Sequence, residues 1–287
     1  MAIYRAAAKI NLTLEVLARR DDGYHALRSV MVPLELADEL SIEPSDAFAF
    51  TCDRPELAGA DNLAVRALHA LGSLPSVRLA LNKRIPTQAG LGGGSSDAAA
   101  VLRAAMDGAF GPQPSRDWPG IARSLGSDVP FFLAGTGALV EGTGERVTPL
   151  GALPAWHVLV VKPPAAVSTA AAYAELDRHE RPSRPRASSV SIEVLTALQR
   201  GDFDAVQDGL SNDFQTPIAA MEPAIETALG ALREAGASNA VLAGSGACVF
   251  TLAPDGATIG RIERRLSLPP SHVRFVTAFA ATPDWRS

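Results

Sequence analysis

The chain has 287 residues, of which 47% are hydrophobic and 20% are charged, and its formal net charge is −5. This composition supports a sizeable buried core and excludes a chain that is disordered throughout. The acidic balance and the lack of any block of like charges argue against nucleic acid and against an anionic membrane surface as the main partner. Glycine and proline, at 24 and 21 residues, are in mild excess without a repeat.

Cysteine usage and hydropathy indicate a compartment. Cys52 and Cys248 lie far apart in the sequence, so they form neither a disulfide framework nor a CxxC metal pair. A reducing environment fits this usage. No apolar run approaches the roughly 18 residues of a membrane span, and residues 1–5 carry no apolar signal core. We expect a cytoplasmic protein without a membrane partner, and the sequence leaves the oligomeric state open.

In the first half of the chain, apolar alternation and turn residues predict several strands. They are expected at residues 4–16, at 30–36 and 39–42 as a pair, at 48–50, at 77–81, and as a hairpin within 135–147. Helices are predicted from Asn62 to Gly72, over 95–106 and over 115–125, from helical spacing and capping residues.

The second half is predicted to be mostly helical, with helices at 191–198, 204–210, 223–235 and 257–266. Strands are expected at 158–161, 240–243, 248–251 and 273–279, and a polar loop at 181–186. Because strands and helices mix without a regular β-α-β alternation, the pattern favours an α+β fold over a doubly wound sheet.

One glycine-rich run stands between a predicted strand and a predicted helix: Pro86-Thr87-Gln88-Ala89-Gly90-Leu91-Gly92-Gly93-Gly94-Ser95-Ser96-Asp97. Four glycines in five positions allow several backbone N–H groups to point into one concavity, and a helix N-terminus adds positive potential. Together these features favour the binding of a polyphosphate. The run lacks the lysine of G-x-x-x-x-G-K-[ST] and the third glycine of G-x-G-x-x-G, so a glycine-rich hinge is the alternative.

The glycine-rich run is similar to the second motif of the GHMP kinases, the family of galactokinase, homoserine kinase, mevalonate kinase and phosphomevalonate kinase. Ala8-Lys9-Ile10-Asn11-Leu12 resembles the first motif, and residues 243–250 (Ala-Gly-Ser-Gly-Ala-Cys-Val-Phe) resemble the third. The three motifs occur in the family's order over nearly the whole chain. Residues 20–25 (Arg-Asp-Asp-Gly-Tyr-His) most resemble the members that act on a cytidine diphosphate derivative of methylerythritol.

The resemblance implies a fold and a reaction. The expected fold has a GHMP kinase N-terminal domain at 1–152, similar to the ribosomal protein S5 domain 2-like fold, and a ferredoxin-like C-terminal domain at 153–287. The expected reaction is phosphorylation of the 2-hydroxyl of 4-(cytidine 5'-diphospho)-2-C-methyl-D-erythritol by ATP with Mg²⁺, in the non-mevalonate isoprenoid pathway. Another GHMP kinase activity and a nucleotide-binding module without catalysis are the alternatives.

Two charged residues are the catalytic candidates. Lys9 lies in an apolar strand, where a lone ammonium group is costly unless it is paired; the alternative is an edge-strand lysine that reaches water. Asp128 lies in a Gly-Ser-Asp-Val-Pro context and could be an ordinary N-cap or turn carboxylate. The resemblance implies that Asp128 accepts the hydroxyl proton and that Lys9 lies beside it and stabilises the transferring phosphoryl group.

The remaining site residues also follow from the resemblance. Asn11 leaves the strand on the same face as Lys9, and is expected against the sugar alcohol. Tyr24 is expected to stack on cytosine and His25 to donate hydrogen bonds to it; ordinary surface aromatics are the alternative. Two looser matches complete the substrate site: Thr169 and Tyr173. Residues 86–96, including both serines as caps or phosphate contacts, are expected to bind ATP, and the metal ligands stay unassigned.

Two positions depart from the family pattern. Gln88 replaces a small residue, and its bulk could either narrow the mouth of the glycine-rich run or point outward. Ser211-Asn212-Asp213-Phe214-Gln215 resembles a family Asn-Asp-Leu-Glu segment but departs from it at Phe214 and Gln215, so the final acidic residue is lost. Any function of that acid in the family is therefore in doubt for this chain.

Overall fold

The computed structural model describes residues 1–21, 23–72, 74–112, 115–179 and 189–280. Its strands are β1 (Ala2–Arg19), β2 (His25–Pro44), β3 (Ala49–Cys52), β4 (Val77–Asn82), β5 (Ala138–Gly142), β6 (Arg146–Pro149), β7 (His157–Lys162), β8 (Ser211–Asn212), β9 (Val241–Leu242), β10 (Val249–Ala253) and β11 (Val273–Ala278).

The α-helices are α1 (Leu63–Ala70), α2 (Gly93–Met106), α3 (Trp118–Leu125), α4 (Val129–Ala134), α5 (Thr169–Arg178), α6 (Val190–Arg200), α7 (Phe203–Gly209), α8 (Gln215–Met221), α9 (Pro223–Glu234) and α10 (Gly256–Arg265). A short 3₁₀ helix, η1, spans Pro55–Leu57. In the part of the chain that the structure describes, no helix is both long and apolar enough to cross a membrane.

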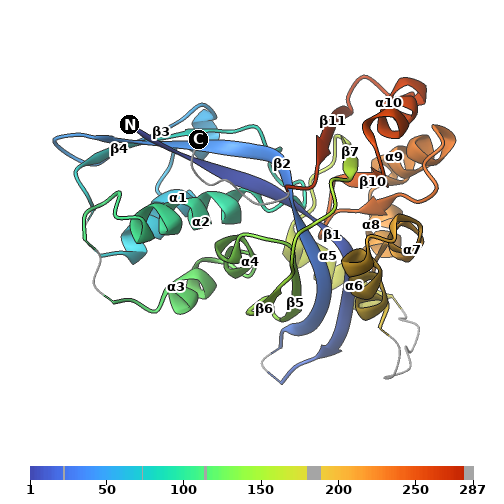
Figure 1. The fold of residues 1–287 in the computed structure, drawn as a ribbon, viewed down its shortest axis with the longest axis horizontal. Coiled ribbons are helices and arrows are strands. Elements are labelled where there is room, and N and C mark those ends of the chain that lie inside the picture. The colour runs from blue at the N-terminus through green and yellow to red at the C-terminus, as the bar shows by residue number, and fades with distance from the viewer. Residues whose placement is uncertain (22, 73, 113–114, 180–188, 281–287) are drawn as a thin grey trace.

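The strands form two sheets, and the fold is α+β as predicted. The first sheet has the order β3-β4-β2-β1-β8, with β5 on β2 and β6 on β5. The second is antiparallel, in the order β11-β7-β10-β9. The long β1–β2 hairpin runs between the two halves of the molecule (Figure 1). Because β8 comes late in the chain and pairs with β1, the second half of the sequence completes the first sheet.

The pairing of β1 with β2 is irregular on both sides of one short segment. The register shifts between Ala7 and Lys9, and again between Asn11 and Thr13. Such bulges disrupt the ladder locally and re-aim side chains, and they are over-represented next to active sites. Lys9 and Asn11 therefore occupy a segment whose side-chain directions are set by two irregularities.

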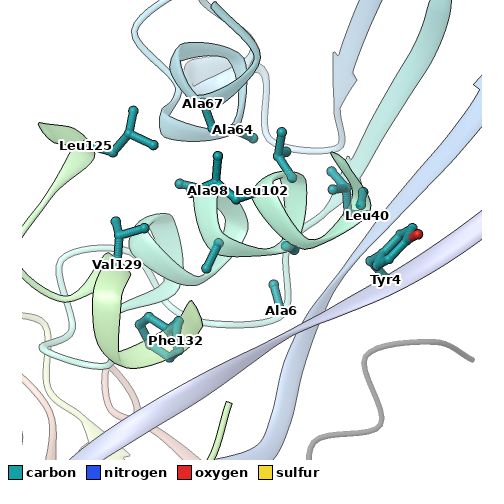
Figure 2. Close-up of a cluster of buried hydrophobic side chains, with 14 of the residues drawn as sticks. Tyr4, Ala6, Leu40, Ala64, Ala67, Ala98, Leu102, Leu125, Val129 and Phe132 are labelled. Atoms are coloured by element: carbon teal, nitrogen blue, oxygen red, sulfur yellow. The ribbon is translucent and has the colours of Figure 1, made fainter. Parts of the chain in front are cut away.

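An alanine-rich helix forms the centre of the first hydrophobic core. Ala98 and Leu102 of α2 are completely buried and face Ala64 and Ala67 of α1 (Figure 2). Alanine leaves little volume between neighbouring backbones, so α2 packs closely against α1 on one face of the first sheet. Phe132 of α4 fills the space on the other side of α2 (Figure 2). This packing fixes the position of α2, whose N-terminus lies in the glycine-rich run.

A second cluster joins the two sheets. Ile10 and Val30 of the hairpin pack with Val160 and Phe250 of the second sheet, and all four are completely buried. A third cluster lies between the second sheet and α8, α9 and α10. The hairpin is thus buried between both halves, which explains why its polar side chains need partners inside the protein.

Several sequence predictions need correction. Residues 30–42 belong to one strand, β2, rather than a strand pair. Helix α2 begins at Gly93 with Gly92 as its N-cap, so Ser95 and Ser96 lie in the first turns and are not caps. The helices α4, α5 and α8 were not predicted. The predicted polar loop at 181–186 lies outside the described residues.

Candidate active site

Two neighbouring cavities, each of about 660 Å³, share part of their lining. The first is lined by residues 86–95 and by Lys9, Asn11 and Asp128; the second is lined by Tyr24, His25 and Asp177. Three residues line both: Ser127, Thr169 and Tyr173. Two connected cavities of this size suit two ligands whose reacting groups meet at the junction.

The glycine loop, residues 86–94, is fastened to its surroundings by backbone hydrogen bonds. The amide of Lys9 donates to the carbonyl of Leu91 at 3.0 Å, and that of Cys248 donates to Ala89 at 3.1 Å. Gly90 has φ +74°, and a Cβ there would lie 1.9 Å from the carbonyl oxygen of Ala243. The loop therefore packs directly on the chain around the Gly-Ser-Gly turn (residues 244–246).

The start of α2 suits an anion. The helix has no side-chain cap from the described residues, so its first N–H groups remain available at the positive end of the helix dipole. Ser95 lines the cavity, whereas Ser96 is completely buried and does not belong to the described lining. Of residues 86–96, all except Ser96 line the first cavity. Gln88 is exposed, with φ +50°.

Lys9 is buried and paired rather than directed into water. Its Nζ donates to Oδ1 of Asn11 at 2.8 Å and lies 3.6 Å from Oδ2 of Asp128. A Cβ at Gly244 would lie 3.1 Å from the same Nζ, so the third motif reaches Lys9 because it carries no side chain there. The ammonium group is thereby placed between the glycine loop, the first motif and Asp128.

Asp128 occupies the N-cap position of α4 without capping it. Its side chain makes no capping hydrogen bond to the first turn of α4, a segment that the structure describes in full. Instead the carboxylate is directed at Lys9 and is about one third exposed, at 34%. A carboxylate that is held by a cation and still open to the cavity is suited to accept a proton from a bound hydroxyl group.

The second cavity has an aromatic wall. The rings of His25 and Tyr173 stack at 5.2 Å, and Nε2 of His25 lies 2.9 Å from Oδ1 of Asp177 without the alignment of a hydrogen bond. Tyr24 is 68% exposed and lines this cavity. In this arrangement Tyr173 presents one ring face to His25.

Thr169 lies where the two cavities join. It is the first residue of α5, and its Oγ1 is 3.2 Å from Oγ of Ser245 in the Gly-Ser-Gly turn. The contact connects the wall of the second cavity to the turn that supports the glycine loop. A ligand that reaches from one cavity into the other would pass these two hydroxyl groups.

The chain matches both halves of a family description: "GHMP kinases N terminal domain" at residues 62–136 and "GHMP kinases C terminal" at 194–270. A Deinococcus radiodurans protein named 4-diphosphocytidyl-2-C-methyl-D-erythritol kinase is 41% identical, over 88% of this chain and 84% of its own length. The chain belongs to the GHMP kinase family. A relative of the same name from an Anaeromyxobacter species is 43% identical, over 85% of this chain and 80% of its own.

Solved structures agree with the assignment to the GHMP kinases. A crystal structure of 4-(cytidine 5'-diphospho)-2C-methyl-D-erythritol kinase has a TM-score of 0.79 and 36% identity, and the match covers 97% of this chain and 99% of that one. Homoserine kinase from Cytophaga hutchinsonii has a TM-score of 0.73 at 16% identity, over 100% of this chain and 96% of its own. The second likeness shows the shared GHMP kinase fold alone.

Sequence reasoning missed a buried charged cluster next to the glycine loop. The ammonium group of Lys83 contacts carboxylate oxygens of Asp38 and, at 2.6 Å, of Asp97. Asp38 also accepts the backbone N–H groups of Arg84 and Ile85 at the entry to the glycine loop. The cluster therefore ties β2, the loop and α2 together, and its one sequence signal is an aspartate that precedes the alanine run.

The charged cluster perturbs two pKa values. Burial is the largest cause that raises the pKa of Asp97 to about 7, with Lys83 opposing and Asp38 adding to the shift. Burial would lower the pKa of Lys83, but the two carboxylates outweigh it and raise that pKa. A Cβ at Gly93 would lie 3.1 Å from Cγ2 of Ile85 and 3.4 Å from Nζ of Lys83, so the start of α2 packs against the residues around this cluster.

Asp97→Asn should change how stability depends on pH. The folded-state pKa of Asp97 is about 7, above the ordinary 3.8. The contribution of protonated Asp97 to the free energy of unfolding is therefore fully present below about pH 4 and is lost as pH rises through 7. Asparagine cannot ionise, so we expect its unfolding midpoint to rise relative to the unaltered chain by several degrees between pH 5 and pH 8. A difference in midpoint that is constant over this range, measured by thermal unfolding, would contradict the ionisation of Asp97.

Residues 211–215 form hydrogen bonds to the chain at 242–244 although the acidic residue of the family pattern is replaced by Gln215. Nδ2 of Asn212 donates to the carbonyls of Leu242 and Gly244, at 2.8 and 2.7 Å. Oε1 of Gln215 accepts the amide of Leu242 at 2.9 Å. An amide oxygen thus fills the acceptor position in this chain, and the segment holds the strand that leads into the Gly-Ser-Gly turn.

Proposed function

We propose that this chain transfers the γ-phosphoryl group of ATP to the 2-hydroxyl of 4-(cytidine 5'-diphospho)-2-C-methyl-D-erythritol, in the non-mevalonate isoprenoid pathway. The observation that carries the proposal is the ion pair of Lys9 and Asp128 in the first cavity, next to Ser127, which lines both cavities. The glycine loop lies on one side for ATP, and an aromatic wall lies on the other for cytosine. The names of relatives at 36–43% identity supply the identity of the alcohol.

Asp128, Lys9 and Asn11 each contribute to a different part of the reaction. Asp128 accepts the proton of the 2-hydroxyl as its oxygen forms a bond to the γ-phosphorus, and the bond from that phosphorus to the bridging oxygen breaks to release ADP. The ammonium group of Lys9 and the N–H groups at the start of α2 stabilise the charge that spreads over the transferred group. Asn11 orients Lys9 and contacts the sugar alcohol.

Mg²⁺ belongs to this proposal as a companion of ATP. The described residues contain no group of three His, Cys, Asp or Glu side chains that would hold a resident metal. Hydroxyl and carboxylate oxygens at the first cavity are nevertheless the hard donors that Mg²⁺ prefers, and this ion commonly binds through few protein ligands together with substrate phosphates. When bound, it would neutralise phosphate charge.

We also propose a domain boundary and a cellular location. A division at residue 152 places the domain boundary between the end of β6 at Pro149 and the start of β7 at His157, where the chain passes from the first sheet to the second. A cytoplasmic location is supported by two free cysteines, Cys52 and Cys248.

A steady-state assay tests the proposed function. The chain is incubated with Mg²⁺, ATP and one alcohol at a time: the cytidyl methylerythritol compound, homoserine or mevalonate. We expect turnover of the cytidyl compound alone, because the aromatic cavity has no evident use for the two smaller alcohols. Turnover of homoserine or mevalonate with none of the cytidyl compound would refute the proposed substrate and leave a kinase of different specificity.

Tyr24→Ala should weaken cytosine binding selectively. Base–aromatic stacking contributes about 1–3 kcal/mol, so we expect the KM for the cytidyl substrate to rise about tenfold while the KM for ATP stays nearly constant. Tyr24→Phe keeps the ring and serves as the matched control, with near-normal KM values. An equal rise in both KM values would show that Tyr24 does not hold the base.

A further inference from the structure

The orientation of Asn11 depends on a residue outside both cavities. Nδ2 of Asn11 donates to Oγ of Ser29 at 2.8 Å, and Oγ of Ser29 donates to the backbone carbonyl of Thr13 at 2.6 Å. Ser29 lies on β2 and is 1% exposed. It does not occur among the described residues that line the two cavities, so any effect on the reaction must pass through a neighbour.

The bonds around Ser29 have only one possible direction. A backbone carbonyl can only accept, so the single hydroxyl proton of Ser29 points at Thr13. Oγ of Ser29 must then accept, and the group of Asn11 that faces it must be the donating NH₂. The carbonyl oxygen of the Asn11 amide is therefore turned the other way, toward Nζ of Lys9, which can only donate.

The directions of these hydrogen bonds originate in the register shift between β1 and β2. Between Asn11 and Thr13, β1 advances by one residue more than β2 does. There the amide of Val30 donates to Oγ1 of Thr13 at 3.1 Å, while the Thr13 carbonyl accepts from Ser29. The side chains of Thr13 and Ser29 thus replace backbone partners at the bulge. The resulting hydrogen-bond directions continue from Ser29 through Asn11 to Lys9.

We propose that Ser29 is a positioning residue for phosphoryl transfer, because it fixes the Asn11 amide that holds Lys9 beside Asp128. The inference rests on the proposed function of Lys9. Without the Ser29 hydroxyl, the NH₂ group of the Asn11 amide loses its acceptor, and only the bond from Lys9 still orients the amide. An amide that turns toward another acceptor withdraws its oxygen from Nζ of Lys9, and the lysine then moves away from its position 3.6 Å from Asp128.

Ser29→Ala tests the proposal in the full chain. A small displacement of a catalytic group costs up to about 10²-fold in rate, and we expect kcat to fall about 10- to 100-fold with the KM for ATP nearly unchanged. Ser29→Thr restores the hydroxyl group and should recover most of the rate. Ser41→Ala is the matched control, since Ser41 lies on the same strand and donates to the carbonyl of Ala80 away from the site.

A double-mutant cycle with Asn11→Ala separates positioning from general destabilisation. If Ser29 acts through Asn11, the double variant should be no slower than Asn11→Ala alone, since the two losses share one route. Losses of kcat that multiply in the double variant would overturn the proposal. A loss of kcat in Ser29→Ala that is fully explained by a lower unfolding midpoint would also overturn it. A kcat within about twofold of normal for Ser29→Ala would do the same. If Ser29→Ala does not fold, Ser29→Cys, with a weaker donor, replaces it in the cycle.

The test does not depend on the identity of the alcohol. Ser29 acts on Lys9 whichever acceptor is bound, so the variants are assayed with the alcohol that the unaltered chain phosphorylates fastest. Failure of the cytidyl compound with the unaltered chain would count against the proposed substrate, whereas equal rates of Ser29→Ala and the unaltered chain would count against the positioning role.

Discussion

Asp128→Asn should lower kcat by about 10²- to 10⁴-fold, the usual contribution of a positioned general base. Asparagine keeps the shape of the side chain and still offers an oxygen to Lys9, so the buried ammonium group does not lose its neighbour. The KM for ATP should remain near normal because the backbone hydrogen bonds that hold the glycine loop come from Lys9 and Cys248 and do not involve the Asp128 side chain. Steady-state kinetics with both substrates measures the effect.

Comparison with Asp128→Ala distinguishes a base from a mere holder of Lys9. A holder tolerates asparagine but not alanine, whereas a base is lost equally in both variants. Asp117→Asn is the matched control: this exposed carboxylate caps α3 by accepting from Gly120, and asparagine caps equally well. A near-normal kcat for Asp128→Asn would show that Asp128 does not take the proton, and would assign the rate to charge stabilisation by Lys9 and the loop.

Local chemistry made part of the site predictable. Four glycines before an alanine-rich run are enough to predict a phosphate loop, because both the backbone freedom and the helix dipole are properties of a short segment. Likewise, alternation along β1 places Lys9 and Asn11 on one face. The prediction that Lys9 meets Asp128, 119 positions later in the sequence, came from the family resemblance and not from the spacing.

Other elements could not be predicted, since their cause lies in distant contacts. β2 was expected as two strands, at 30–36 and 39–42, and Asp38 of the continuous strand lies between these ranges; a buried aspartate is costly unless it is paired. The strand continues there since Lys83 and two backbone N–H groups surround that carboxylate. The helices α4 and α8 have 6 and 7 residues, too few for a helical period to appear in the sequence.

The choice of Ser95 and Ser96 as caps failed for a reason connected to function. Serine and aspartate are preferred N-caps, so the Ser-Ser-Asp run predicts a helix start there. Gly92 takes the cap position instead, and the helix begins at Gly93 without a side-chain cap from the described residues. A capping side chain would occupy N–H groups of the first turn, and an anion-binding helix keeps these groups available.

Gly90→Ala should separate the glycine loop from the third motif and weaken ATP binding more than tenfold. The new Cβ would lie 1.9 Å from the carbonyl oxygen of Ala243 and 2.8 Å from its carbonyl carbon, both backbone atoms that cannot rotate away. The loop must therefore move, and its hydrogen bonds from Cys248 and Lys9 would stretch. Titration calorimetry with a non-hydrolysable ATP analogue measures the loss, and an unchanged affinity would contradict the assignment of the loop.

Gly72→Ala isolates the contact from the strain of the backbone. Gly72 also has positive φ, at +96°, but a Cβ there would meet nothing within 4 Å. Both variants incur roughly 1–2 kcal/mol for a left-handed residue with a Cβ, so both should lose some thermal stability. Only Gly90→Ala should also lose ATP affinity, because only there does the methyl group push the loop off the chain that supports it. Equal affinity losses in the two variants would mean that destabilisation alone, and not the packing of the loop on the third motif, controls the nucleotide site.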